Sequence, residues 1–438
     1  MRAKLEAMWL LWACVAPSSD SGDSGDTGPA SSEAWPGLAT SAAWRSAESG
    51  YATGLGVSDV DGDGDGDVVV AYGNDMVPGP LAIYENEQGV LGETAAWTSE
   101  AHHYFGQLSI GDVDGDGADD LVVSRYVGDE GRFDEPGGVQ LWLGANDGFE
   151  LAWEDDGFYS FSCALGDVDG DGDLDLAVAV GEAYDNEPDR SRVYAWDAGF
   201  ALVWETEGPR HSYDVGWTDP DGDGDLDLVF ASVGSPHALY ENDGGLSDAP
   251  VWEADGERFG GNTLDIGDLD GDGLVDLVIS ENEDLGGSGL VRGWCGPALS
   301  PCFTSGDGAD LQSAVRLEDV DGDGDLDLAA GAWWGAVRLY ENEAGLVATP
   351  RWTSEEDAIV AEALAFEDLD GGEEVVIEGH GLLRVPGRVV SVEGGVAAEG
   401  WASGPGSLTV RYLASTDKDL LVTDWSLDGG NLAYGRAR

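Results

Sequence analysis

The sequence predicts an all-β fold, a β-propeller built from four-stranded antiparallel blades. An aspartate-rich loop followed by a short apolar run recurs about every 50 residues, and an aromatic residue recurs with the same spacing. Each repeat also contains four short strand-like segments separated by turn signals. Repeats of this kind are typical of propeller blades, which form a closed ring and leave only short sheet edges exposed.

The first 14 residues have the features of an export signal. Arg2 and Lys4 precede an apolar stretch, residues 8–13, that is too short to span a bilayer. The residues that end at Cys14 resemble a bacterial lipobox, and this resemblance implies cleavage and lipidation at Cys14. We therefore expect an exported cell-envelope lipoprotein, with plain secretion as the alternative.

Residues 15–39 follow as a serine-, glycine- and aspartate-rich segment, and its stretch from Ser18 to Gly28 has no apolar residue to bury. This composition is typical of a disordered, extended tether. We expect the tether to set the folded part of the chain, residues 40–438, away from its anchor.

The repeats can be counted in two independent ways, and both counts predict eight blades. The loops begin at Asp59, Asp112, Asp167, Asp219, Asp268 and Asp319, with a decayed seventh at Asp368 and a remnant eighth at Asp417. The aromatic residues of the same period are Trp44, Trp97, Trp153, Trp204, Trp252, Phe303, Trp352 and Trp401.

The two ends of the repeat region predict how the ring closes. Trp44 occupies the position of a fourth strand, but no first three strands precede it. The chain ends with a third strand at residues 430–434 that has no fourth strand after it. We therefore predict that an N-terminal strand completes the last blade.

The sixth repeat shows the expected order of elements. Residues 314–317 form the first strand, and the aspartate-rich loop leads into the second strand at 328–330. The third strand covers 336–340, and the fourth surrounds Trp352. The tripeptide Tyr-Glu-Asn follows the third strand in three repeats, at Tyr84, Tyr240 and Tyr340.

The aspartate-rich loops have the composition of a calcium site. Carboxylates occupy loop positions 1, 3, 5 and 9, and glycine occupies position 6, where a sharp turn is needed. The EF-hand loop has the same opening, but it closes with a bidentate glutamate at position 12 and lies between two helices. Here position 12 of the sixth loop is Ala330, and the residues that follow are strand-like.

The loops and the Tyr-Glu-Asn turns resemble the FG-GAP/VCBS repeat family, whose best-known members are the head propellers of integrin α-chains. The resemblance covers residues 40–438. It implies that each loop joins the first and second strands of a blade and holds Ca²⁺. Integrin propellers have seven blades, so seven blades remain the alternative to eight.

The resemblance implies about six Ca²⁺ ions. Their ligands would be side chains at positions 1, 3, 5 and 9 and the backbone carbonyl at position 7: Asp59, Asp61, Asp63, Asp65 and Asp67; Asp112, Asp114, Asp116, Ala118 and Asp120; Asp167, Asp169, Asp171, Asp173 and Asp175; Asp219, Asp221, Asp223, Asp225 and Asp227; Asp268, Asp270, Asp272, Leu274 and Asp276; Asp319, Asp321, Asp323, Asp325 and Asp327.

Crowded carboxylates repel one another, so we expect Ca²⁺ binding to supply folding energy and to stabilise each blade rather than to take part in chemistry. The seventh loop keeps Asp368, Asp370 and Glu374 but lacks the position-5 carboxylate. We predict that it does not bind metal.

The net charge of −69, with Lys4 and Lys418 as the only lysines, excludes nucleic acid and acidic membrane surfaces as electrostatic partners. Contact with a membrane would then occur only through the N-terminal anchor.

The four cysteines have different expected roles. Cys295 and Cys302 flank a turn-rich segment and could form a disulfide in an oxidising compartment, with two free thiols as the alternative. Cys163 lies in a strand-like run, where we expect a buried apolar residue rather than a nucleophile.

We expect the function to lie on the face opposite the metal loops, where the family resemblance implies ligand binding. The connections after the second and fourth strands carry most of the aromatic and arginine residues that could recognise a partner: Tyr104, Arg125, Tyr126, Arg132, Phe133, Phe158, Tyr159, Tyr184, Arg190, Arg210, His211, Tyr213, Arg258, Phe259, Trp333 and Trp334. Each of them could instead cap the core of a blade.

The favoured function is a monomeric binding or adhesion module for protein or glycan at the cell surface. A purely structural envelope protein is one alternative, and a polysaccharide lyase or hydrolase is another. We expect no enzyme, because none of the five histidines lies in a recognisable nucleophile or metal motif: His102, His103, His211, His237 and His380.

Overall fold

The computed structural model describes most of the repeat region. The described residues are 44–45, 52–63, 67–73, 77–86, 92, 94–129, 135–145, 148–184, 186–306, 311–318, 324–335, 338–342, 345–353, 359–368, 373–379, 386–393, 396–405, 409–413, 419–423 and 432–435. The expected signal, Cys14 and the tether lie outside these residues.

Five four-stranded sheets form blades 1 to 5, and in each the strands follow one another in chain order. Blade 1 consists of β2 (Ala52–Ser58), β3 (Asp67–Gly73), β4 (Pro78–Tyr84) and β5 (Trp97–Thr98); blade 2 of β6 (Tyr104–Gly111), β7 (Asp120–Val127), β8 (Pro136–Gly144) and β9 (Phe149–Asp156). Blade 3 consists of β10 (Ser160–Gly166), β11 (Asp175–Val180), β12 (Arg192–Trp196) and β13 (Phe200–Glu205); blade 4 of β14 (His211–Thr218), β15 (Asp227–Val233), β16 (Ala238–Tyr240) and β17 (Trp252–Glu253). Blade 5 consists of β18 (Gly261–Gly267), β19 (Asp276–Glu281), β20 (Val291–Cys295) and β21 (Ser300–Thr304).

The remaining twelve strands form blades 6 to 8 and are joined into one sheet. Short pairings of β23 with β26 and of β27 with β30 make this sheet continuous. Blade 6 consists of β22 (Leu311–Glu318), β23 (Asp327–Gly335), β24 (Arg338–Tyr340) and β25 (Trp352–Thr353); blade 7 of β26 (Ile359–Asp368), β27 (Glu373–Gly379), β28 (Pro386–Glu393) and β29 (Val396–Pro405); blade 8 of β30 (Thr409–Leu413), β31 (Asp419–Thr423), β32 (Leu432–Gly435) and β1 (Trp44–Arg45).

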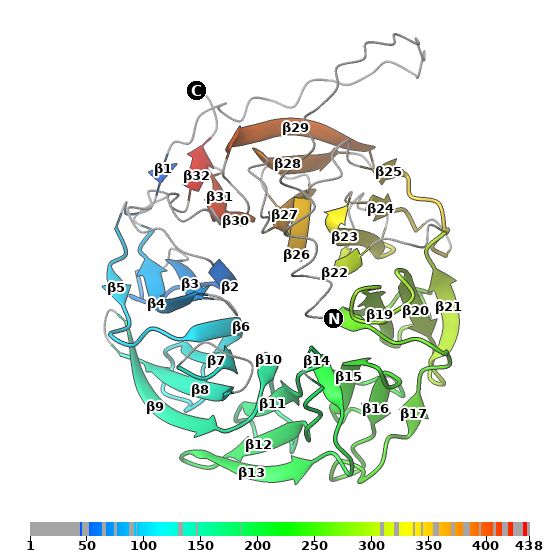
Figure 1. Cartoon of the computed structure of the whole chain (residues 1–438), viewed down its shortest axis with the longest axis horizontal. Coiled ribbons are helices and arrows are strands. Elements are labelled where there is room, and N and C mark those ends of the chain that lie inside the picture. The colour runs from blue at the N-terminus through cyan, green and yellow to red at the C-terminus, as the bar shows by residue number, and fades with distance from the viewer. Residues whose placement is uncertain are drawn as a thin grey trace.

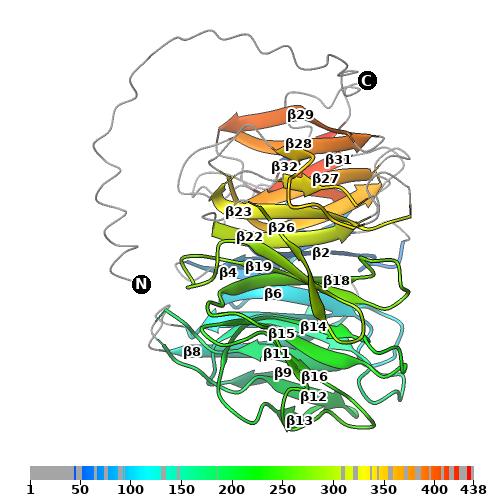
Figure 2. The same ribbon diagram turned by 90° about the vertical axis from the view of Figure 1, so that its right-hand side faces the viewer.

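The blades are arranged around a ring, with the first strand of each blade near the centre and the fourth at the rim (Figure 1). Seen edge-on, the inner strands cross the thickness of the disc (Figure 2). The all-β prediction is confirmed, and the described residues form eight blades. No helix in this part of the chain is long and apolar enough to cross a membrane.

The N-terminal strand completes the last blade, as the sequence predicts. Strand β1 pairs antiparallel with β32, so that Trp44 lies opposite Ala433 and Arg45 opposite Leu432. Blade 8 therefore combines the two ends of the repeat region, and this pairing replaces an unpaired sheet edge.

The apolar run after each metal loop becomes the second strand of a blade and is buried on both faces. All seven residues of β3 are buried, and so are all seven of β15. Each core cluster joins neighbouring blades: Val69 and Ile83 of blade 1 pack with Phe105 and Leu121 of blade 2. This explains why these strands are continuously apolar instead of alternating.

The periodic aromatic residues hold the rim of the disc together. Trp153 of β9 packs edgewise on Tyr194 and Phe200 of blade 3, with ring centroids 5.1 and 5.3 Å apart. Trp204 packs in the same way on Tyr240 of the next blade at 4.9 Å. The aromatic period therefore reflects contacts between blades, worth about 0.5–1.5 kcal/mol each beyond the buried area.

Candidate metal centres

The meander order of the strands divides the connections between two faces of the disc. Connections between strands 1 and 2 and between strands 3 and 4 of each blade share one face, which we call the metal-loop face. Connections between strands 2 and 3 and between successive blades share the other, which we call the opposite face.

The position-1 aspartate organises the third, fourth and fifth metal loops by accepting hydrogen bonds from the backbone. In the third loop, Asp167 Oδ1 accepts from the N–H groups of Gly170 at 2.8 Å and Asp171 at 3.1 Å, and Oδ2 accepts from Gly172 at 3.0 Å. Asp219 and Asp268 accept from the equivalent glycines of their loops. The loop backbone is thus wrapped around one carboxylate by hydrogen bonds that do not depend on a bound ion.

Two glycines in each of the second to fifth loops adopt a left-handed backbone conformation. In the third loop Gly170 has φ of 74° and Gly172 has φ of 98°. The sequence predicts the need for glycine at position 6, which is Gly172, but not the equal need at position 4. Side chains with a Cβ rarely adopt this conformation, so both positions require glycine.

The closing aspartate at position 9 has a structural role that the sequence does not predict. Asp175 is 1% exposed, and its two carboxylate oxygens accept from the N–H groups of Val168 at 2.9 Å and Trp196 at 3.0 Å. Asp120 and Asp276 bridge the loop and the end of the third strand in the same way. Burial raises the pKa of Asp175, although the backbone hydrogen bonds act in the opposite direction.

The structure brings three carboxylates together in each of the first four loops, with ligand oxygens within 4.8 Å of one another. Positions 1, 3 and 9 meet in the first three loops and positions 1, 3 and 5 in the fourth: Asp59, Asp61 and Asp67; Asp112, Asp114 and Asp120; Asp167, Asp169 and Asp175; Asp219, Asp221 and Asp223.

The fifth loop brings Asp270 and Asp276 together beside the sulfur of Cys295. Cys295 forms a disulfide with Cys302, so it offers no thiolate to a metal. Of the other predicted ligands, Asp65, Asp319, Asp321 and Asp323 lie outside the described residues.

The described loops fit a hard divalent cation. Oδ1 of Asp112 is buried and has no hydrogen-bond partner. One carboxylate oxygen of the second loop is therefore available to coordinate a cation. Clustered carboxylate oxygens without a soft donor are the ligands that Ca²⁺ prefers. The loop residues would hold the ion, and the ion would neutralise carboxylates that otherwise repel one another.

Six of the residues expected to recognise a partner are instead buried: Tyr104, Arg125, Phe158, Tyr159, Tyr213 and Phe259. Arg125 is 5% exposed and pairs with Asp156 at 3.1 Å and with Glu154 at 3.7 Å. The expectation that these residues lie in connections is also wrong for Tyr104, Arg125 and Tyr213, which lie within β6, β7 and β14.

The remaining candidates keep some exposure on the opposite face. Arg190 and Arg258 are exposed, and those that are half-buried are Tyr126, Tyr184, Arg210, His211 and Trp333. Arg132, Phe133 and the side chain of Trp334 lie outside what the structure describes.

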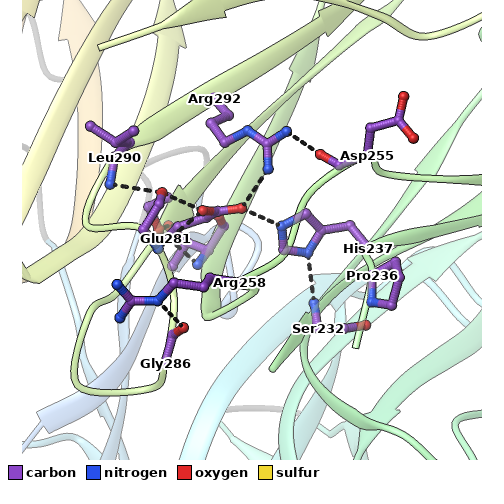
Figure 3. A network of polar contacts seen from close by, with 12 residues as sticks. Ser232, Pro236, His237, Asp255, Arg258, Glu281, Gly286, Leu290 and Arg292 are labelled. Atoms are coloured by element: carbon purple, nitrogen blue, oxygen red, sulfur yellow. Dashed lines mark hydrogen bonds and ion pairs between the residues drawn. The ribbon is translucent and has the colours of Figure 1, made fainter. Parts of the chain in front are cut away.

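A buried ionic network that the sequence does not predict joins blades 4 and 5 near the opposite face (Figure 3). Glu281 and His237 are both fully buried, and Oε1 of Glu281 contacts His237 Nε2 at 3.2 Å and Arg292 Nη1 at 3.1 Å. Because His237 Nδ1 accepts the N–H of Ser232 at 3.0 Å, the ring proton lies on Nε2 and is donated to Glu281. Since Nδ1 accepts a hydrogen bond, the ring is neutral, and burial, which lowers the pKa of His237, favours that form.

Family models match three segments of the chain. Residues 59–123 and 219–279 match the FG-GAP-like repeat, and residues 161–196 match the FG-GAP repeat. Human integrin alpha-X is 34% identical over 143 residues, an alignment that covers 26% of this chain and 12% of that protein.

Several solved structures share the fold at low sequence identity. The V. cholerae biofilm matrix protein Bap1 is 14% identical with a TM-score of 0.61, over 92% of this chain and 91% of that one. Chaetomium thermophilum Sqt1, bound to the N-terminus of ribosomal protein L10, is 14% identical with a TM-score of 0.59, over 91% and 100%. Bacillus licheniformis rhamnogalacturonan lyase PL11 is 13% identical with a TM-score of 0.55, over 88% and 72%.

The matched segments each contain an aspartate-rich loop and the strand that follows it. The chain is therefore a β-propeller that carries FG-GAP repeats.

Proposed function

We propose that the protein is an extracytoplasmic, Ca²⁺-stabilised propeller that binds a protein or glycan ligand at the cell surface through its opposite face. A monomeric module with no enzymatic activity fits this role. The disulfide between Cys295 and Cys302 supports an oxidising compartment outside the cytoplasm.

The observation that carries this proposal is the difference between the metal loops and the connections from strand 2 to strand 3, which lie on the opposite face. The metal loop always has eight residues, as between Gly166 and Asp175 in blade 3. The connection from strand 2 to strand 3 varies from two residues after β23 to eleven after β11. Metal loops of constant length indicate a shared structural task, whereas variable loops on a rigid scaffold are where binding specificity usually lies.

Screening a glycan array and candidate surface proteins in millimolar Ca²⁺ tests the proposal. With the ligand in hand, replacing the exposed Arg190 and Arg258 by alanine should weaken binding about tenfold or more, because exposed arginines are enriched among the residues that dominate interfaces. The matched control is Arg351→Ala, since Arg351 lies in a connection on the metal-loop face. Binding that survives the double substitution, or is lost equally in the control, would contradict this surface.

The fold shared with a rhamnogalacturonan lyase supports a polysaccharide-active enzyme as the alternative. His211 is the described histidine that suits it best, because it is half-buried on the opposite face and its Nε2 has no hydrogen-bond partner. Turnover of acidic polysaccharides that disappears in His211→Ala would favour the enzyme over the binding module.

A further inference from the structure

The asparagine that ends the Tyr-Glu-Asn tripeptide of blade 4 joins two neighbouring metal loops. Asn242 is 2% exposed, and its Nδ2 donates to the carbonyl of Val168 at 2.7 Å and to that of Leu226 at 3.2 Å. Val168 is position 2 of the third loop, and Leu226 is position 8 of the fourth. Oδ1 accepts the N–H of Gly245 at 2.7 Å, which holds the carboxamide in place.

Blade 6 repeats this arrangement with Asn342, which is also 2% exposed. Its Nδ2 donates to the carbonyl of Leu269 in the fifth loop at 2.8 Å and to that of Leu326 in the sixth at 3.0 Å. Its Oδ1 accepts the N–H of Gly345 at 2.7 Å. The same side chain in the same place therefore spans two loops in two separate pairs of blades.

Blade 1 has the same asparagine, Asn86, which is 5% exposed, but the loop of the preceding blade 8 lies outside the described residues. Blades 2, 3 and 5 lack it. The equivalent residues of blades 2, 3 and 5 are Gly144, Trp196 and Gly296, whose backbone N–H groups reach the closing aspartate of their own loop. Among the described residues, no hydrogen bond joins the second loop to the third or the fourth loop to the fifth. In the part of the chain that the structure describes, these side-chain links join the third loop with the fourth and the fifth with the sixth, not every neighbouring pair of loops.

We propose that Asn242 and Asn342 are positioning residues that couple Ca²⁺ binding between paired loops, the third with the fourth and the fifth with the sixth. This inference rests on the proposed Ca²⁺ binding. Each bonded carbonyl lies next to predicted ligands: Val168 lies between Asp167 and Asp169, and Leu226 precedes Asp227. An ion that orders one loop fixes the carbonyl that the asparagine holds, which lowers the ordering cost of the partner loop.

The test is a set of calorimetric Ca²⁺ titrations on the full chain. The double substitution D167N/D169N removes binding at the third loop. Coupling predicts that one ion is lost and that a second, at the fourth loop, binds about 5–150-fold more weakly, the range typical of coupled sites. In the N242A background, D167N/D169N should abolish binding of one Ca²⁺ ion and leave the affinities of the other sites unchanged.

The matched control is N342A, because Asn342 is equally buried and makes the same hydrogen bonds. In the N342A background, abolishing Ca²⁺ binding at the third loop with D167N/D169N should still weaken Ca²⁺ binding at the fourth loop. Asn242→Ser is the second variant if Asn242→Ala does not fold. The coupling is contradicted if D167N/D169N in the otherwise unchanged chain leaves the affinity for every other Ca²⁺ ion unchanged. It is also contradicted if N242A and N342A have the same effect on these affinities. A wild-type chain that binds no Ca²⁺ would instead refute the proposed metal function itself.

Discussion

Replacing Asp276 by alanine is expected to lower the free energy of unfolding in saturating Ca²⁺ by about 3–5 kcal/mol, because a buried and a half-buried N–H group lose their acceptor at about 1–3 kcal/mol each. These are the N–H groups of Leu269 and Gly296, at 2.8 and 2.7 Å from the carboxylate. The fifth loop also loses a predicted ligand, which removes the stabilisation by its ion. Denaturant unfolding with and without EGTA measures both effects.

The matched control for this prediction is Asp272→Asn in the same loop. Asp272 is exposed, and its Oδ1 accepts only the N–H of Leu274 at 2.9 Å, a bond that an asparagine oxygen retains. We expect this variant to weaken metal binding and to leave the EGTA-treated protein as stable as the wild type. Equal losses in both variants without Ca²⁺ would contradict the structural role of the closing aspartate.

Replacing Glu281 by alanine is expected to destabilise the protein by about 3–5 kcal/mol, the usual cost of breaking a buried ion pair from one side. The substitution leaves the Nε2–H of His237, one guanidinium nitrogen of Arg292 and the hydroxyl of Ser288 without their acceptor (Figure 3). Thermal or denaturant unfolding measures the loss. The control is Glu253→Ala, which breaks the more exposed pair with Arg210 and should cost no more than about 1 kcal/mol.

The contribution of Glu281 should depend on pH. Burial by itself raises the pKa of Glu281, but hydrogen bonds from His237 and Ser288 and the charge of Arg292 outweigh it and hold the pKa below its ordinary value. The folded state then binds fewer protons than the unfolded state, so the stabilisation is present above an unfolded pKa of about 4.3 and is lost as the pH falls through the folded value. The stability difference between wild type and Glu281→Ala should therefore shrink below about pH 4.

The architecture was predictable because the signals for it repeat. An apolar second strand, a rim aromatic residue and a turn-forming loop recur along the chain, so a weak local signal becomes strong when it is found in register. The unmatched strands at the two ends predicted the pairing of Trp44 with the last blade, since a ring must close and an isolated strand cannot remain unpaired.

The details of the sites were less predictable, because they depend on contacts between segments far apart in the chain. From its loop position Asp175 was predicted to be a metal ligand. Only the fold places its carboxylate where it accepts a hydrogen bond from the N–H of Trp196. Phe158 lies in a connection and Arg125 near the end of β7, and both were expected at the surface, but the fold buries them. Glu281 ends an apolar strand with no local sign that His237, in the preceding blade, lies beside it.

The central claim is that aspartate clusters hold calcium and thereby stabilise successive blades. Calcium titration by isothermal calorimetry, paired with thermal unfolding in Ca²⁺ and in EGTA, tests it most directly. We predict about six bound ions and a large rise in melting temperature, since each independent site adds about 2.7 kcal/mol at a hundred times its Kd. A melting temperature that is the same in Ca²⁺ and in EGTA would contradict the claim.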